Sequence, residues 1–240
     1  MALEAARIWA ERAFFCLDRQ GAFRVALSGG RTPELLFRLL AEARFQRLPW
    51  DKTEVFWVDE RRVPYDRPES NYRLARELLL DKVPLARGRI HPMPTGSGEP
   101  AEDAAAYEAL LRKTFPGRAW PGLDLCLLGL GEDGHTASLF PGGPELAERR
   151  RWVAATRSPK GVAGRLTLTL PALWASGLRL FLACGREKSA AVRAVLGPAQ
   201  PPMLPAQMAW RSEGRKVLLL DKQAAGPAGP ARHKAAAGDV

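Results

Sequence analysis

Residues 123 to 141 read LDLCLLGLGEDGHTASLFP, and this segment changes character halfway along. Its first part is mostly apolar, as is typical of a strand that is buried on both faces of a sheet. The second part, from residue 129, holds three glycines together with two carboxylates, a histidine, a threonine and a serine. In open α/β sheets, ligands bind beyond the carboxyl ends of the strands. The segment therefore predicts a parallel-sheet protein with its chemistry in the loops that follow strands.

Five further segments have the composition of buried strands, and four segments between them have helical patterns. The strand-like segments are FRVALS (23 to 28), EVFWVD (54 to 59), RLTLTL (165 to 170), LRLFLA (178 to 183) and KVLLLD (216 to 221). The helical segments are TPELLFRLLAEA, SNYRLARELLLDKV, EDAAAYEALLRKTF and REKSAAVRAVL. This alternation predicts an α/β fold with an open, mostly parallel sheet and helices on both faces.

An amphipathic helix is expected over residues 3 to 19, before the first strand. Its apolar side is predicted to cover the sheet. That side consists of Leu3, Ala6, Ile8, Ala10, Ala13, Phe14 and Leu17.

The length of 240 residues and the hydrophobic content of 46% allow a substantial core. We expect one domain over residues 1 to 222. Residues 223 to 240 are rich in Ala, Gly and Pro, which predicts a disordered tail. No apolar run is long enough to span a membrane, and the first residues do not have the pattern of a secretory signal. The sequence thus predicts a cytoplasmic protein, either a monomer or a small homo-oligomer.

Cysteines, histidines and charge argue against several functional classes. The three cysteines lack CxxC spacing and the three histidines lack HExxH spacing, so neither a disulfide framework nor a metal site is expected. The net charge of +10 comes from 28 arginines and 8 lysines that are spread along the chain without a dense basic block. Such a field favours an anionic small substrate over a nucleic acid.

The loop SGGRTPELLF, after the first predicted strand, has the composition of a phosphate cradle. Thr32 is placed to cap the following helix. The backbone amides of Gly29 and Gly30 and the hydroxyls of Ser28 and Thr32 can hold a phosphate. A tight turn with no ligand explains the loop equally well, and the GxxxxGK spacing of a Walker loop is absent.

The second loop, VDERRVPYDRPESNY, puts charges of both signs at the end of a strand. Arg61 can pair with a phosphate or carboxylate, and Asp59 can accept hydrogen bonds from substrate hydroxyls. Ser70 is the expected N-cap of the next helix. A solvated cluster of salt bridges is the alternative interpretation.

The third loop matches GxGxxG, the spacing of dinucleotide-binding loops, at Gly129, Gly131 and Gly134. The prolines and glycines at 141 to 144 leave barely two turns for the helix that would receive a pyrophosphate. No acid follows at the distance where a ribose would need one. No nicotinamide or flavin cofactor is therefore expected.

The other interpretation of the third loop is catalytic. His135 stands two residues after Asp133, and an unperturbed histidine titrates at about pH 6.5, so this pair can take a proton from water and return it. The absence of a GxSxG elbow argues against Ser138 as a nucleophile. Arg165 and Lys188, each next to a predicted strand, can close on a phosphate, although either can equally be an ordinary surface charge.

Taken together and in this order, SGGRTP, VDERRVP with SNY, GLGEDGHTASLFP, RLTLTLP and CGREKS resemble the glucosamine-6-phosphate isomerase/6-phosphogluconolactonase family, and its lactonases in particular. The resemblance runs from about residue 5 to about residue 221 and leaves the tail outside. It implies a Rossmann-like sheet of the sugar-phosphate isomerase/deaminase type. It also implies hydrolysis of 6-phosphoglucono-δ-lactone to 6-phosphogluconate, a step of the oxidative pentose phosphate pathway, without metal or organic cofactor.

The resemblance further implies roles for single residues. His135 corresponds to the general base and acid of the family, with Asp133 in support. Asp59 stands where the related deaminases keep an acid. The expected partner is a small phosphorylated sugar lactone, with no nucleic acid and no membrane. The family's substrate- and phosphate-binding positions match Ser28, Gly29, Gly30, Thr32, Arg61, Arg165 and Lys188.

Two alternatives remain open from the sequence. A deaminase or isomerase of the same fold would carry a further glutamate shortly after DGH, whereas here no acid appears before Glu145. A non-catalytic sugar-phosphate-binding protein would keep the phosphate cradle but would not need the Asp133 and His135 pair.

Overall fold

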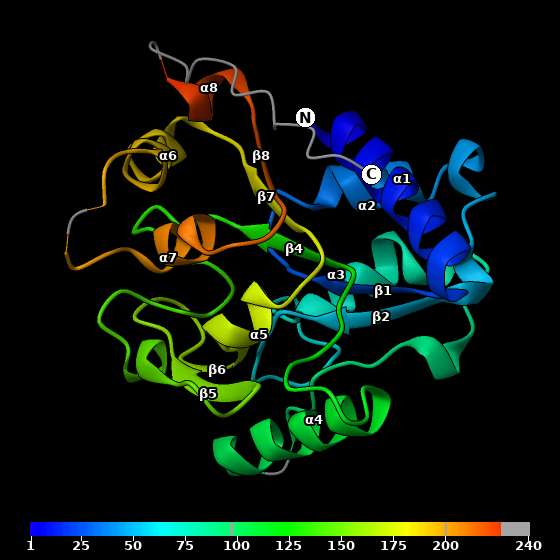
Figure 1. Ribbon diagram of the computed structural model, residues 1–240, viewed down its shortest axis with the longest axis horizontal. Helices are drawn as coiled ribbons and strands as arrows, with labels where there is room; N and C mark the ends of the chain where they lie inside the picture. The colour runs from blue at the N-terminus through cyan, green and yellow to red at the C-terminus, as the bar shows by residue number, and fades with distance from the viewer. Residues whose placement is uncertain (97, 200, 227–240) are drawn as a thin grey trace.

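The computed structural model describes residues 1–96, 98–199 and 201–226 (Figure 1). At its centre lies a parallel sheet of five strands in the order β2-β1-β4-β7-β8. The strands are β1 (Phe23–Leu27), β2 (Thr53–Trp57), β4 (Leu125–Gly129), β7 (Arg179–Ala183) and β8 (Lys216–Leu220). Each of them overlaps a segment that the sequence predicts as a strand. The expected open, mostly parallel α/β sheet is confirmed.

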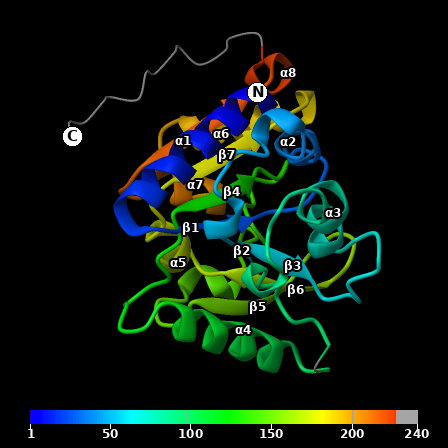
Figure 2. The same ribbon diagram turned by 90° about the vertical axis from the view of Figure 1, so that its right-hand side faces the viewer.

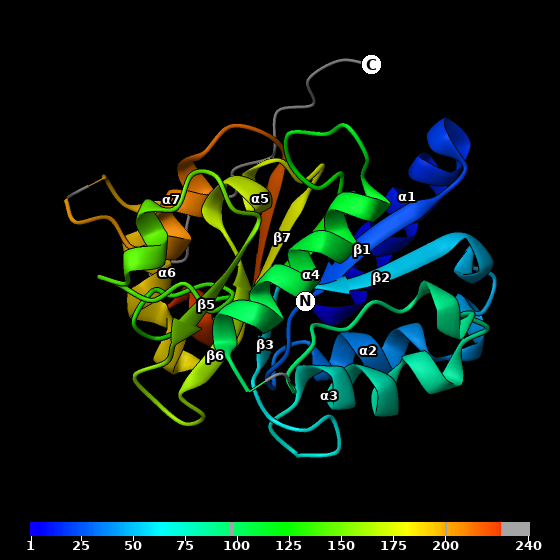
Figure 3. The ribbon, with the colours of Figure 1, turned by 90° about the horizontal axis from the view of Figure 1, so that it is seen from below.

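Helices lie on both faces of this sheet, as predicted. The crossover from β1 to β2 contains α2 (Glu34–Leu40), and the crossover from β7 to β8 contains α6 (Ser189–Leu196) and α7 (Pro205–Arg211). These crossovers run in opposite directions along the sheet, so right-handed connections place their helices on opposite faces. Figures 1 and 3 show this arrangement, with α1 (Ala2–Gln20) packed beside α2.

Further helical segments complete the chain between these elements. The remaining α-helices are α3 (Asn71–Leu78), α4 (Pro100–Thr114), α5 (Leu170–Trp174) and α8 (Lys222–Ala225). The 3-10 turns are η1 (Ala43–Phe45), η2 (Trp50–Lys52), η3 (Leu80–Lys82), η4 (Arg87–Arg89), η5 (Pro144–Ala147) and η6 (Arg186–Lys188).

A second, antiparallel sheet has the order β3-β6-β5 and begins almost where β2 ends. Its strands are β3 (Asp59–Arg61), β5 (Val153–Arg157) and β6 (Gly164–Leu168). The segment RLTLTL is thus a strand, as predicted, but it belongs to this antiparallel sheet. β5 was not expected because, apart from Val153, its residues are only half-buried or exposed and form no apolar run.

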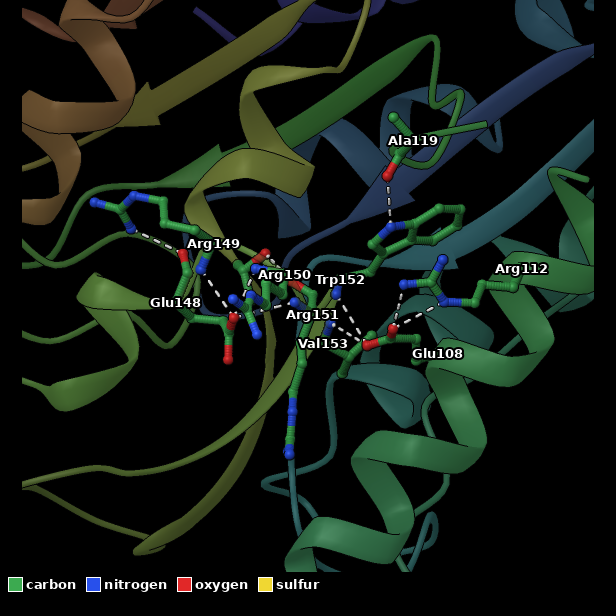
Figure 4. A network of polar contacts seen from close by, with 10 residues as sticks. Glu108, Arg112, Ala119, Glu148, Arg149, Arg150, Arg151, Trp152 and Val153 are labelled. Carbon is green, nitrogen blue, oxygen red and sulfur yellow. Dashed lines mark hydrogen bonds and ion pairs between the residues drawn. The ribbon is translucent and has the colours of Figure 1, made fainter. Parts of the chain in front are cut away.

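Helix α4 covers the second sheet (Figure 2), and a polar network fastens it to β5 (Figure 4). One carboxylate oxygen of Glu108 accepts hydrogen bonds from the backbone N–H groups of Trp152 (2.9 Å) and Val153 (3.3 Å). The other oxygen accepts from Arg112 (2.7 Å), whose guanidinium lies 4.5 Å over the Trp152 ring. Hydrogen bonds to a charged group stabilise more than neutral ones, so this carboxylate holds helix and strand together.

The apolar side predicted for the first helix is wrong in part. Trp9, Ala13 and Cys16 are buried, whereas Leu3 and Phe14 are 57% and 48% exposed. The indole ring of Trp9 makes the contact with the sheet and packs edge-on against Phe23 of β1, with 5.7 Å between ring centroids. The other buried residues of the helix are small. Large apolar residues on the remaining surface are ordinary in folded proteins.

The domain boundary that the sequence predicts at residue 222 falls inside α8. Asp221 caps this turn by accepting a hydrogen bond from the backbone N–H of Ala224 (2.7 Å), and Ala224 is fully buried. The first residues of the predicted tail are therefore packed into the fold, and the rest of it, 227–240, lies outside the described residues. None of the helices that the structure describes is long and apolar enough to cross a membrane.

Candidate active site

The loops that follow β1, β4, β5 and β7, together with residues of β3 and β6, line a cavity of about 640 Å³. Its position at the carboxyl ends of the parallel strands is the one that the fold class predicts. All ten residues singled out in the sequence line this cavity. They are Ser28, Gly29, Gly30, Thr32, Asp59, Arg61, Asp133, His135, Arg165 and Lys188.

The loop after β1 approaches α3 too closely for a side chain at position 29. A methyl group on Gly29 would overlap the carboxamide of Asn71, the first residue of α3. The predicted cap at Thr32 is wrong. A turn from Arg31 to Glu34 comes first, α2 begins at Glu34, and Thr32 makes no capping hydrogen bond. Thr32 is instead part of the cavity wall.

Asp59 lies at the start of β3, and two neighbouring side chains hold its carboxylate. Ser138 donates a hydrogen bond to Oδ2 (2.6 Å), and Asn71 donates to Oδ1 (3.3 Å) and to the backbone carbonyl (2.9 Å). Ser138 is almost fully buried. Asp59 is therefore fixed in orientation where it lines the cavity.

The next residue, Glu60, is fully buried and supports the site from behind. Its carboxylate accepts hydrogen bonds from the backbone N–H groups of Arg61 (2.7 Å), Asn71 (2.7 Å) and Tyr72 (2.7 Å), and from the Ser70 hydroxyl (3.3 Å). Ser70 is the N-cap of α3, as predicted. Burial raises the pKa of Glu60 to about 7, although the backbone hydrogen bonds act in the opposite direction. This one carboxylate ties β3 to the start of α3.

Two arginines stand opposite each other on neighbouring antiparallel strands, since Arg61 of β3 is paired with Arg165 of β6. Like charges in this position repel each other. Burial, and then the charge of Arg61, lower the pKa of Arg165. Each guanidinium donates to a backbone carbonyl, Arg61 to Glu69 (2.6 Å) and Arg165 to Val162 (2.9 Å). In the part of the chain that the structure describes, neither belongs to an ion pair. The pair is suited to binding an anion.

His135 and Asp133 form a close pair in the loop after β4. Nδ1 of His135 lies 2.6 Å from Oδ1 of Asp133, and the backbone N–H of His135 donates to the same oxygen (3.1 Å). Burial tends to raise the pKa of Asp133, but the charge and hydrogen bonds of His135 outweigh it and lower that pKa. An ionised carboxylate can only accept, so Nδ1 of His135 carries the hydrogen of this contact, and in a neutral imidazole Nε2 is then the nitrogen without a hydrogen.

The backbone of this loop is shaped around the imidazole. A methyl group on Gly131 would overlap the His135 ring and lie 2.6 Å from Oδ1 of Asp133. On the other side, the ring packs against Phe140, with 4.9 Å between centroids. Ala137 has φ 49, a conformation that costs strain in a residue other than glycine and is common at functional sites.

Lys188 also lines the cavity, at the end of η6. Its Nζ lies 3.9 Å from Oε1 of Glu132, and its side chain is mostly buried. The Lys188 ammonium is thus the third cationic group on the cavity wall that the sequence singled out, after Arg61 and Arg165.

Several wall residues were not anticipated from the sequence. Asn71 and Gly131 shape the loops around them, and Gln223 comes from the segment that the sequence predicts as a tail. Signals for the first two were present in the sequence, because Asn71 belongs to the SNY pattern and Gly131 to the GxG pattern. For Gln223 no local signal exists, because its place depends on where β8 ends relative to β7.

Comparison with known proteins agrees with this fold. The family described as "Glucosamine-6-phosphate isomerases/6-phosphogluconolactonase" matches residues 1–219. A curated relative, the 6-phosphogluconolactonase of Synechocystis sp., is 42% identical over 229 residues, which cover 91% of this chain and 93% of that protein. The solved 6-phosphogluconolactonase from Trypanosoma cruzi has a TM-score of 0.85 at 29% identity and covers 95% of this chain and 92% of its own.

The fold and the cavity define an α/β protein of the sugar-phosphate isomerase/deaminase type. A monomeric glucosamine-6-phosphate deaminase shares that fold, with a TM-score of 0.77 at 22% identity over 93% of this chain and 94% of its own. The chain belongs to the glucosamine-6-phosphate isomerase/6-phosphogluconolactonase family. Within the family it groups with the 6-phosphogluconolactonases.

Proposed function

We propose that this protein hydrolyses 6-phosphoglucono-δ-lactone to 6-phosphogluconate, with His135 as the general base that activates water. The observation that carries the proposal is the content of one cavity. It holds a carboxylate-supported imidazole together with two opposed arginines, neither of which forms an ion pair among the described residues. The relatives named above are lactonases, which supports the substrate class.

In the proposed mechanism, Nε2 of His135 takes a proton from a water molecule as its oxygen attacks the lactone carbonyl. Asp133 stabilises the imidazolium that forms, because its carboxylate accepts a hydrogen bond from Nδ1. The imidazolium then gives the proton to the ring oxygen as the C–O bond breaks. No covalent nucleophile is needed, and the commitment of the Ser138 hydroxyl to Asp59 argues against one.

The phosphate of the substrate is proposed to bind at the end of the cavity formed by Arg61, Arg165, Lys188 and the loop after β1. A guanidinium fork matches phosphate oxygens, and the repulsion between Arg61 and Arg165 is relieved when an anion lies between them. Binding energy from this remote group fixes the lactone carbonyl near His135, and correct positioning can lower the barrier by several kcal/mol, up to roughly ten.

The position of Glu145 argues against the deaminase alternative. It is the first acid after the DGH sequence, yet it faces a different cavity, which is formed by α4, η5 and β5. A glutamate in that cavity is not placed to move protons on a sugar bound beside His135. A lactone, which is already activated, needs only one base.

A coupled assay tests the proposal. Glucose-6-phosphate dehydrogenase generates the lactone, and the appearance of 6-phosphogluconate is followed with the wild type and with His135→Ala. We expect the variant to lose about 10²- to 10⁴-fold in kcat with little change in KM, as for the removal of a general base. Lactone turnover at the wild-type rate by His135→Ala would contradict the mechanism. Ammonia release from glucosamine 6-phosphate, measured in parallel, would favour the deaminase.

A further inference from the structure

The turn that follows β8 is built into the wall of the cavity. Asp221 directly follows β8 and is the N-cap of α8. Gln223, in this helical turn, lines the cavity together with Cys184, Gly185, Glu187 and Lys188. This wall comes from two adjacent strands, since β7 and β8 are paired in parallel up to Ala183 and Leu220. Their two following loops therefore start side by side.

The carboxylate of Asp221 binds these two loops to each other. It accepts hydrogen bonds from the Cys184 thiol (2.8 Å) and from the backbone N–H of Gly185 (3.1 Å), both in the loop after β7. It also accepts from the backbone N–H of Ala224 (2.7 Å), in α8. Lys188 follows Gly185 by three residues and is connected to it by a backbone hydrogen bond (3.1 Å). A single carboxylate thus sets the relative positions of Lys188 and Gln223.

Packing also leaves α8 little freedom. Ala224 is fully buried in an apolar cluster with Ala191, Val192 and Val195 of α6. At the end of the turn, Gly226 lies so close to α6 that a methyl group there would come within 2.7 Å of the Ser189 hydroxyl. The direction of α8 is therefore fixed, and the exposed side chain of Gln223 is presented to the cavity.

We infer that Gln223 is a substrate-contacting residue that binds the phosphate end of the sugar phosphate, and that Asp221 is the residue that positions both Gln223 and Lys188. This inference deepens the proposed function and rests on it. A neutral amide beside a cation can donate a hydrogen bond to a phosphate oxygen without the charge that would also attract other anions. The reacting carbonyl lies at the His135 end, so these residues govern affinity rather than the chemical step.

Kinetics of four variants in the coupled lactone assay test the inference. Gln223→Ala is expected to raise KM about 2- to 10-fold, the value of one hydrogen bond, with kcat unchanged. Gln223→Glu is expected to raise KM by about tenfold or more, with an increase that shrinks at high salt, because a carboxylate repels the phosphate. Lys222→Ala, in the same exposed turn but outside the cavity, is the matched control and should leave KM unchanged.

Asp221→Ala should raise KM more than Gln223→Ala does, since it releases Lys188 as well. Asp221→Asn should raise KM less than Asp221→Ala does. If KM in both Gln223 variants stays within twofold of the wild type, the inference is overturned while the enzyme itself remains active. A wild type that does not hydrolyse the lactone would instead contradict the proposed function. Binding of 6-phosphogluconate, measured by calorimetry, must weaken in the same order as KM rises. Equal affinity for all variants would likewise overturn the inference.

Discussion

At position 131 the chain has no side chain, and the imidazole of His135 lies in the space that a methyl group would need. The geometry of the site depends on several contacts of this kind, each made by a single residue. The orientation of His135 follows from the Asp133 carboxylate on one side, the Gly131 backbone below and the Phe140 ring beside it. Each of these can be changed without touching a residue that is proposed to meet the substrate.

Gly131→Ala is expected to reduce kcat by about a hundredfold, because the added methyl group displaces the ring and small displacements of a catalytic group are costly. The measurement is lactone turnover together with the thermal unfolding midpoint, which should change far less than kcat does. Gly88→Ala is the control, since a methyl group there meets no atom within 4 Å and lies outside the cavity. Wild-type turnover by Gly131→Ala would show that the ring position is not set in this way.

Glu60 gives a pH dependence to stability. Its pKa rises from 4.5 in the unfolded chain to about 7 in the folded protein, mainly through burial. Between these values the unfolded chain gives up a proton that the folded protein keeps. The contribution of Glu60 to the free energy of unfolding is therefore complete below pH 4.5. It falls by about 3 kcal/mol in total as the pH rises to about 7.

Glu60→Gln should remove that pH dependence, so that the variant is less stable than the wild type at pH 4.5 and the difference in stability shrinks as the pH rises to about 7. The amide nitrogen of a glutamine cannot accept from the N–H groups of Asn71 or Tyr72, and a buried donor without an acceptor costs about 1–3 kcal/mol. Urea unfolding at a series of pH values, compared between wild type and variant, gives the difference directly. A difference that stays constant from pH 4.5 to pH 7 would mean that Glu60 does not titrate in this range.

At the scale of elements, a buried arginine joins the ends of two helices. Arg179, at the start of β7, is fully buried and donates to the carbonyls of Leu173, Trp174, Ser212 and Glu213. These carbonyls lie at the C-terminal ends of α5 and α7, where a helix leaves carbonyls unpaired and carries partial negative charge. One cation thus serves two helix ends, and burial lowers its pKa.

Arg179→Met is expected to destabilise the protein by about 3 kcal/mol, because the carbonyls lose a charged donor in a buried place. The Michaelis constant for the lactone should not change, since Arg179 does not line the cavity. Chemical denaturation measures the first effect and the coupled assay the second. The exposed neighbour Arg215→Met serves as the control, and equal stability of both variants would contradict this role.

The elements differ in how far they could be predicted from the sequence. The five parallel strands were predictable from their apolar runs, which burial on both faces requires of an inner strand such as LRLFLA. β5 and α8 were not predictable, because each is stabilised by contacts with distant segments, β5 by Glu108 of α4, and α8 by α6 and the loop after β7. The residues of the cavity could be named from loop composition and resemblance, but the opposition of Arg61 and Arg165 could not. It depends on the register of two strands that lie far apart in the sequence.

At the scale of the whole molecule, both sheets bring positive charge to the cavity. Arg61 and Arg165 come from the antiparallel sheet, and Lys188 comes from the parallel one. The net charge of +10 is spread over the chain, so local and global contributions to the attraction of an anionic substrate must be separated.

Salt dependence separates these two contributions. In the wild type, kcat/KM for the lactone should fall about three- to tenfold between about 0.05 M and about 0.5 M salt, with kcat unchanged, because salt screens the attraction of the approaching phosphate to the cations of the cavity. Arg165→Gln should raise KM and flatten this dependence. Arg150→Gln removes the same charge from an exposed position outside the cavity and should leave the wild-type slope. If both variants flattened the dependence equally, the overall charge would account for the attraction. A local effect requires that the salt dependence of kcat/KM change in Arg165→Gln and not in Arg150→Gln.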